Sequence, residues 1–200
     1  MTIGLSNKNY NQRGKIRLPW YTVLFWFLCA VWEPTAAFYL PLLSALLHEL
    51  GHYIAACALG VGVKRITVYP FGADMALTSG LRSYGTDLVI AGAGATVNLL
   101  LAALGYGMGN GELIMSNLLL AGVNLLPVAG LDGGAILMAL AGLAGRRGEL
   151  LVKITSFISL FFLWLAAVYI LLIIGGDPSL FVLACGLFVS IFLRGQPSRR

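Results

Sequence analysis

The feature that most limits how this chain can fold is its division into apolar stretches of near membrane-spanning length. A helix needs about 20 predominantly apolar residues to cross the hydrocarbon of a bilayer. The stretches cover residues 18–31, 36–59, 88–106, 113–143, 154–174 and 179–193, and the fourth is interrupted near Pro127–Gly134. The sequence therefore predicts an all-α, multi-pass membrane protein with about six transmembrane helices.

The small supply of charged residues supports this prediction. Only 10% of the 200 residues are charged, whereas a soluble domain carries roughly 25%. The net charge of +5 would suit a nucleic-acid partner in a soluble protein. Here the charges are too few and too scattered for that role, so we expect no nucleic-acid partner. The expected surroundings are the lipid bilayer.

The positions of the basic residues predict the orientation in the membrane. If the chain crosses six times, all thirteen basic residues fall on one side, and the connections near Glu33, Glu112 and Asp177 carry acids only. The positive-inside rule then places both termini in the cytoplasm. The basic residues are Lys8, Arg13, Lys15, Arg17, Lys64, Arg65, Arg82, Arg146, Arg147, Lys153, Arg194, Arg199 and Arg200.

The sequence predicts one integral membrane domain over residues 1–200, preceded by a polar cytoplasmic tail at 1–17. A basic start followed by a short apolar run also fits a cleavable signal peptide. No clear A-x-A cleavage site follows it, so an uncleaved first helix is favoured. The three cysteines have no regular spacing and are expected to pack rather than to form disulfides or bind metal.

The two histidines of the chain lie in the second stretch, in the run His48-Glu49-Leu50-Gly51-His52. Four residues advance a helix by about 400°, so both imidazoles project from one face within reach of one ion. Glu49 lies beside them, where it can act as a general base on water instead of binding the metal. A histidine–glutamate pair that only satisfies itself is the alternative. It is harder to sustain in a membrane, where ionisable side chains are costly and indicate function.

Two histidines leave a catalytic metal site incomplete, because such a site usually has three protein ligands and one open position. Apart from Glu49, Asp132 is the one acidic residue expected at membrane depth. Pro127 and neighbouring glycines break the helix there, and irregular backbone at that depth is tolerated only where it is buried or lines a cavity. Asp132 is therefore the predicted third ligand. The alternative is an aspartate that caps a helix kink.

These residues resemble the site-2 proteases, intramembrane zinc metalloproteases of family M50, and in particular their small sporulation-type branch. The resemblance covers about residues 38–140, a three-helix catalytic core. It depends on the order and spacing of four motifs. They are His48-Glu49-Leu50-Gly51-His52, Tyr69-Pro70-Phe71-Gly72, Gly94-Ala95-Thr96-Val97-Asn98, and Asn124-Leu-Leu-Pro127 through Leu131-Asp132-Gly133-Gly134.

The resemblance implies one catalytic zinc ion held by His48, His52 and Asp132, with Glu49 as the catalytic base. Asn98 and Asn124 are weaker candidates for substrate binding, and each could equally form an interhelical hydrogen bond. The implied activity is zinc-dependent endopeptidase cleavage of membrane-embedded or membrane-associated proteins near the cytoplasmic face of a bacterial cell membrane. The implied substrate is a transcription-factor precursor or an anti-sigma factor, and a membrane regulatory partner is expected.

Residues 61–69 have β-branched side chains in weak alternation and predict a short strand or hairpin after the second helix. We expect this strand to offer an edge to an extended substrate, although an ordinary cytoplasmic loop is an equal alternative. The rival functions are a metal-transport protein that uses the same His and Asp site without proteolysis, and a catalytically silent membrane binding protein. Neither rival has a use for Glu49.

Overall fold

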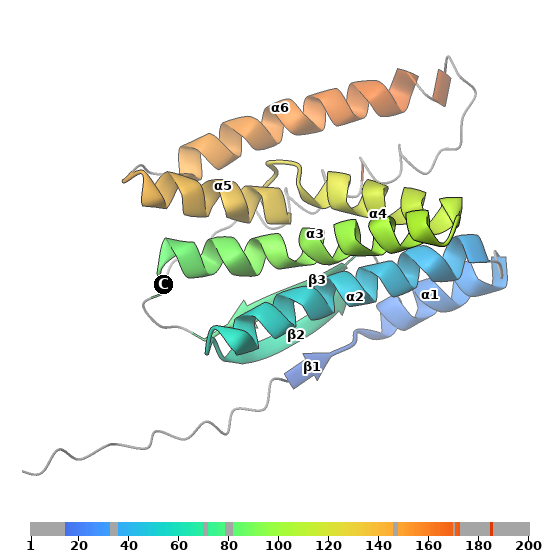
Figure 1. The fold of residues 1–200 in the computed structure, drawn as a ribbon. Helices are drawn as coiled ribbons and strands as arrows, with labels where there is room; N and C mark the ends of the chain where they lie inside the picture. The colour runs from blue at the N-terminus through green and yellow to red at the C-terminus, as the bar shows by residue number, and fades with distance from the viewer. Residues whose placement is uncertain are drawn as a thin grey trace, which may run out of the picture.

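The computed structural model describes residues 15–32, 36–69, 72–78, 82–145, 148–169, 171–172 and 185. These residues form six helices and three strands, and the helices run side by side (Figure 1). The elements are β1 (Lys15–Arg17), α1 (Trp20–Trp32), α2 (Ala36–Ala58), β2 (Val63–Tyr69), β3 (Gly72–Leu77), α3 (Tyr84–Gly107), α4 (Gly111–Asn124), α5 (Asp132–Leu143) and α6 (Gly148–Tyr169).

The first three predicted stretches become α1, α2 and α3, with ends that differ from the prediction by at most four residues. The fifth stretch becomes α6, which begins at Gly148, six residues before the predicted start. The sixth stretch, 179–193, lies outside the described residues apart from Cys185. The predicted total of about six transmembrane helices therefore stays a prediction.

The fourth stretch is broken, as the sequence predicts, into α4 and α5, which lie end to end in Figure 1. The break covers residues 125–131, so the two glycines expected in it belong instead to the first turn of α5. A Cβ on Gly133 would collide with the carbonyl oxygens of Leu125 and Leu126, and one on Gly134 would collide with the carbonyl of Val128. Glycine at both positions lets the start of α5 pack directly against the loop that leads into it.

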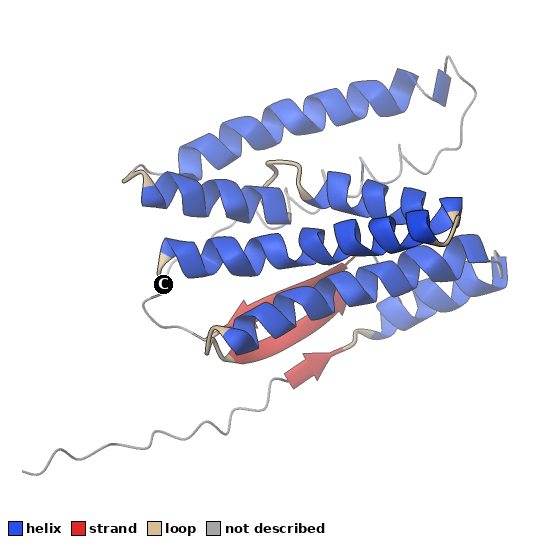
Figure 2. Ribbon diagram, viewed as in Figure 1, coloured by secondary structure: helices blue, strands red, loops and turns tan. Residues whose placement is uncertain are grey.

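The three strands form one sheet, in which β2 lies between β1 and β3 (Figure 2). The β2–β3 pair is an antiparallel hairpin, which confirms the hairpin expected after α2. β1 pairs in parallel with β2, with Lys15 opposite Arg65 and Arg17 opposite Thr67. The last residues of the predicted N-terminal tail are therefore part of the sheet. The expectation that β2 offers its edge is wrong for Arg65–Thr67, because both sides of that segment are already paired.

The hairpin packs against the helices that carry the histidines. Ala56 of α2, Val63 of β2 and Ile90 of α3 form a buried cluster, and Met75 of β3 packs against it. On α1, Thr22 is fully buried, and its hydroxyl donates a 3.0 Å hydrogen bond to the carbonyl of Val68. Burial of these apolar side chains holds the sheet beside the helices.

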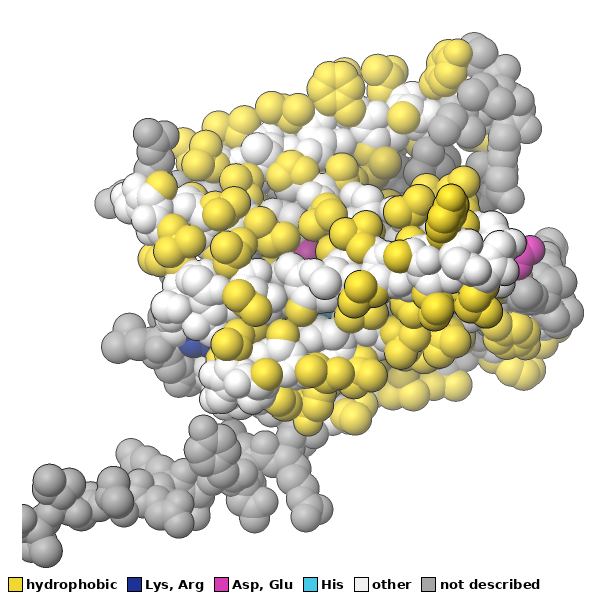
Figure 3. All heavy atoms as spheres, in the orientation of Figure 1, with side chains coloured by type: hydrophobic (Ala, Val, Ile, Leu, Met, Phe, Trp, Pro, Cys, Tyr) yellow, Lys and Arg dark blue, Asp and Glu magenta, His cyan; other side chains and the backbone are white. Residues whose placement is uncertain are grey.

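Much of the outer surface is apolar. Hydrophobic side chains spread over the visible face in Figure 3, where few charged side chains appear. Leu100 of α3 is 66% exposed and Phe157 of α6 is 75% exposed. Large exposed apolar areas are rare on soluble monomers. Among the described helices, α3 and α6 are long and apolar enough to cross a membrane, judged by length and composition.

Candidate metal centre

The histidine pair lies on one face of α2, as the four-residue spacing predicts. His48 and His52 are both buried. Their Nε2 atoms lie 3.1 Å apart, and their rings meet edge to face at 81°. A neutral imidazole offers a metal one ring nitrogen, so the two Nε2 atoms form one side of a binding site.

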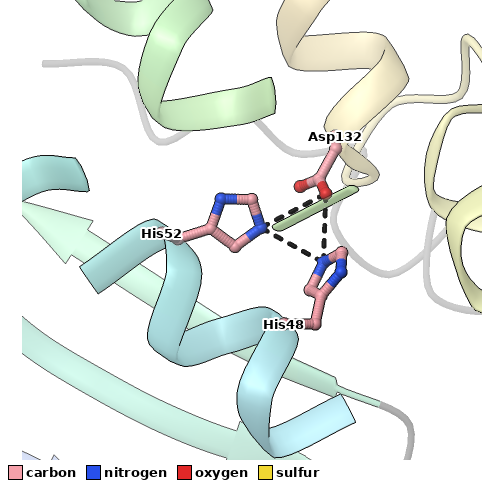
Figure 4. Close-up of side chains that lie close together, drawn as sticks. All are labelled: His48, His52 and Asp132. Atoms are coloured by element: carbon pink, nitrogen blue, oxygen red, sulfur yellow. Dashed lines mark hydrogen bonds and ion pairs between the residues drawn. The ribbon is translucent and has the colours of Figure 1, made fainter. Parts of the chain in front are cut away.

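Asp132 completes the cluster from a different part of the chain. It is the first residue of α5, and its Oδ2 lies 3.1 Å from Nε2 of His48 and 3.2 Å from Nε2 of His52 (Figure 4). The structure thus brings together the three predicted ligands. All of their candidate ligand atoms lie within 4.8 Å of one another.

Hydrogen bonds on the far side of each ring show which nitrogen carries the proton. His52 Nδ1 lies 2.7 Å from the main-chain carbonyl of Ile90, which can only accept, so Nδ1 of His52 is the donor. His48 Nδ1 lies 2.5 Å from Oδ1 of Asn98, which is also an acceptor. In the neutral rings, both Nε2 atoms therefore carry lone pairs that point toward the carboxylate.

With both imidazoles neutral, the three facing acceptors favour a cation bound between them. Oδ2 of Asp132 is buried and has no hydrogen-bond donor within the described part of the chain. A buried acceptor without a partner is costly, and buried charges are usually paired or bound to metal. Two imidazole nitrogens and one carboxylate oxygen are a donor set that catalytic zinc takes, with a fourth position left open. The residues present therefore fit a divalent metal ion.

Two glycines allow α2 and α3 to approach closely at this centre. A Cβ on Gly51 would lie 2.7 Å from Cγ2 of Val97 and 3.1 Å from the carbonyl oxygen of Ala93. A Cβ on Gly94 would overlap the imidazoles of both His48 and His52. The backbone of α3 at Gly94 thus forms one wall of the metal centre.

The loop that delivers Asp132 is held by α6. The hydroxyl of Thr155 lies 2.9 Å from the carbonyl oxygens of both Pro127 and Leu151, so its one proton is shared between the loop and its own helix. The hydroxyl of Ser156 accepts a 2.8 Å bond from the backbone N–H of Ala129 and donates to the carbonyl of Val152. These bonds satisfy polar groups of an irregular backbone at the depth of the helices, where water is scarce.

The remaining predicted site residues occupy different positions. Glu49 is half-buried on α2, next to His48 in the chain. Asn98 is fully buried and bonds both His48 and Asn117. Asn124 is half-buried at the end of α4, and its amide donates to the carbonyl of Leu120 in its own helix.

Sequence reasoning missed four polar residues that support the centre. Asn117 of α4 and Ser44 of α2 are buried beside Asn98, and Thr155 and Ser156 hold the loop before Asp132. Asn117 carries a usable signal, because a polar amide within an apolar stretch is costly unless it is bonded. The serines and the threonine carry no such signal, since these residues are common in transmembrane helices.

Comparisons with known proteins agree with this geometry. Residues 36–112 match peptidase family M50, a range that holds both histidines and Asn98 but ends before Asp132. A Synechocystis sp. protein, provisionally described as a zinc metalloprotease, is 32% identical over 162 residues, which cover 75% of this chain. The site-2 protease from Methanocaldococcus jannaschii has a similar fold, with a TM-score of 0.67, 23% identity and 92% of each chain covered.

All three matches support the site-2 protease family, peptidase family M50, and the four ordered motifs agree with them. The matched region amounts to 41% of the length of the Synechocystis sp. relative.

Proposed function

We propose that this protein is an intramembrane zinc endopeptidase that cleaves membrane-embedded or membrane-associated proteins. The observation that carries the proposal is the convergence of His48 Nε2, His52 Nε2 and Asp132 Oδ2 on one point with no donor among them. Glu49 directly follows His48 on α2. A carboxylate beside the metal ligands, but outside the ligand set, is what peptide hydrolysis requires and what metal transport does not.

The proposed chemistry divides between the ion and the side chains. A zinc ion bound here supplies Lewis acidity for the scissile carbonyl and for water. The two histidines and Asp132 hold the centre in place, and the bonds from Nδ1 of each histidine fix the ring orientations. Glu49 acts as the general base that takes a proton from water and passes it to the leaving amide nitrogen.

The site is proposed to lie near the cytoplasmic face. If the basic residues mark the cytoplasm, α2 runs inward and ends at Ala58. His52 is then about 9 Å below that end, at 1.5 Å of rise per residue. Water would reach Glu49 from the cytoplasm, and substrates would be cut close to that face.

An extended substrate segment is proposed to pair with β3. Unlike the middle of β2, β3 has one partner among the described strands. Strand addition would unwind a helical substrate and present its amide bonds to the centre. The substrate is expected to be a membrane-anchored regulatory protein, such as a transcription-factor precursor or an anti-sigma factor.

The decisive experiment compares Glu49→Gln with the wild type in purified form and in membranes. Zinc content and cleavage of a membrane-anchored reporter are measured together. Retained zinc with cleavage reduced at least about a hundredfold supports the peptidase, since general-base catalysis contributes roughly 10²–10⁴ in rate. Metal transport by both proteins, without cleavage by either, would support the rival transport function instead.

A further inference from the structure

A hydrogen-bonded network of buried polar side chains connects the metal centre with α4. Ser44, Asn98 and Asn117 are each at most 1% exposed. Asn98 Oδ1 faces Nδ1 of His48, Asn98 Nδ2 donates over 2.9 Å to Oδ1 of Asn117, and Asn117 Nδ2 reaches Oγ of Ser44 at 3.0 Å. Ser44 and His48 lie one turn apart on α2, so the network begins and ends on the same helix.

One main-chain carbonyl fixes the direction of every bond that leads to His48. Asn117 Nδ2 donates a 2.9 Å bond to the carbonyl of Leu113, which can only accept. The oxygen of the Asn117 amide must then face Asn98, so Asn98 must present its NH₂ group to Asn117. The oxygen of Asn98 is left for His48, whose Nδ1 must carry the proton. Nε2 of His48 is thereby left with its lone pair toward Asp132.

We propose that Asn117 is a positioning residue of the metal centre: through Asn98, it fixes the tautomer and the orientation of the His48 ring. The inference deepens the proposed function, because it assumes that the centre binds zinc. Asn117 itself bonds to Asn98, Ser44 and Leu113, and it reaches His48 only through Asn98.

The two histidines show why a second amide is needed. His52 is oriented by the main-chain carbonyl of Ile90, which has one possible polarity. His48 is oriented by a side-chain amide, which can present either oxygen or NH₂ after a 180° flip. An NH₂ group facing Nδ1 would favour the opposite tautomer and place a proton on Nε2, where the metal must bind. Asn117 removes this choice, whereas a role in helix packing alone would not depend on bond direction.

The test measures zinc affinity of the full chain in detergent by competition with a chelator, without substrate. Asn117→Leu removes the acceptor for Asn98, and we expect zinc affinity to fall about tenfold, as for other partners of metal-bound histidines. In Asn117→Asp, the neutral acid keeps a carbonyl for Asn98 and an O–H for Leu113, so we expect most of the affinity to return. Ser116→Ala, which loses a hydroxyl bonded to the same Leu113 carbonyl, is the matched control and should bind zinc like the wild type.

A double-mutant cycle tests the route through Asn98. A carboxylate at position 98 offers His48 only acceptors, so the ring direction no longer depends on residue 117. Asn117→Leu should therefore cost less zinc affinity in the Asn98→Asp background than in the wild type. If Asn117→Leu fails to fold, Asn117→Asp is compared with the wild type in both backgrounds, and the zinc affinity of Asn98→Asp alone serves as the reference.

Two results would overturn the positioning role. One is an equal loss of zinc affinity in Asn117→Leu and Asn117→Asp, and the other is an undiminished cost of Asn117→Leu in the Asn98→Asp background. Neither result bears on proteolysis. Conversely, a wild type that binds zinc in this assay but cleaves no membrane protein would refute the peptidase and leave the role of Asn117 intact.

Discussion

Gly94 of α3 lies against His52 so closely that a Cβ at position 94 would overlap Nε2 of that histidine. The same Cβ would lie 2.7 Å from Nε2 of His48. Both overlaps involve the nitrogens that would bind the metal. Glycine is therefore needed at position 94 because a side chain would occupy the metal centre, and not because the backbone there requires glycine.

Gly94→Ala is expected to abolish zinc binding while α3 remains helical. The added methyl group must displace both imidazoles, and neither can move without losing the bond at its Nδ1. Zinc content after purification measures the effect. Gly92→Ala is the control, because a Cβ at position 92 meets nothing within 4 Å. Normal zinc content in Gly94→Ala would contradict the close packing of α3 on this centre.

Asp132→Asn is expected to change stability in opposite directions with and without metal. With zinc, the variant should unfold at a lower temperature than the wild type, since it lacks the anionic ligand and gains less from binding. In chelator at alkaline pH, where both imidazoles are neutral, it should be at least as stable as the wild type, because an amide NH₂ can donate to an imidazole Nε2, whereas the carboxylate faces only other acceptors. Thermal unfolding in detergent under both conditions measures this. The same order of stability in both would contradict the acceptor-only arrangement.

Ser156→Ala is expected to weaken zinc binding from a position outside the metal centre. The change leaves the N–H of Ala129 without its partner, at a cost of about 1 kcal/mol, and loosens the loop that sets Asp132. Zinc affinity and unfolding temperature should both fall. Ser159→Ala makes the same chemical change on α6 and serves as the control. An effect of equal size at Ser159 would point to general weakening of α6 rather than to the loop.

Ala73→Pro is expected to reduce substrate cleavage while zinc binding stays normal. Tyr69 and Gly72 flank the hairpin turn as a pair, and bonded pairs alternate along an antiparallel ladder, so the N–H of Ala73 points away from β2. Proline is tolerated at such edge positions but cannot donate to an added strand.

Ala76→Pro provides the comparison, because the same alternation turns its N–H toward β2, and it should disrupt the hairpin itself. Unchanged cleavage in Ala73→Pro would argue against substrate pairing along β3. Both variants are assayed with the same membrane-anchored reporter, alongside zinc content.

Features with a local cause could be predicted from the sequence. The joint placement of His48 and His52 follows from helical periodicity, and the two residues do share a face of α2. Asp132 could be predicted as their partner because few acids lie at membrane depth and the helix breaks just before it. Pro127 and the nearby glycines predict the interruption of the fourth apolar stretch, and the gap between α4 and α5 confirms it.

Features that depend on how distant segments pair or pack, and that no scarce residue type marks, could not be predicted. Lys15–Arg17 is too short to show a strand period, and its place in the sheet depends on pairing with β2, far away in the chain. The hydrogen-bonded network through Asn117 depends on how α2, α3 and α4 pack together, which the residue spacing within one helix does not indicate. The sequence marked Asn98 as polar and near the site, but its bonding to His48 required the packed helices.

The candidate metal ligands lie on elements that are far apart in the chain, so they are synthesised at different times. The two histidines and the hydrogen-bonded network beside them lie on α2, α3 and α4. Asp132 belongs to α5, and the loop before it is held by α6. Elements are synthesised in chain order, so both histidines are made before Asp132, and α6, which secures the loop before Asp132, follows later. The proposed catalytic centre would therefore be completed late in synthesis, after most of the described helices have been made.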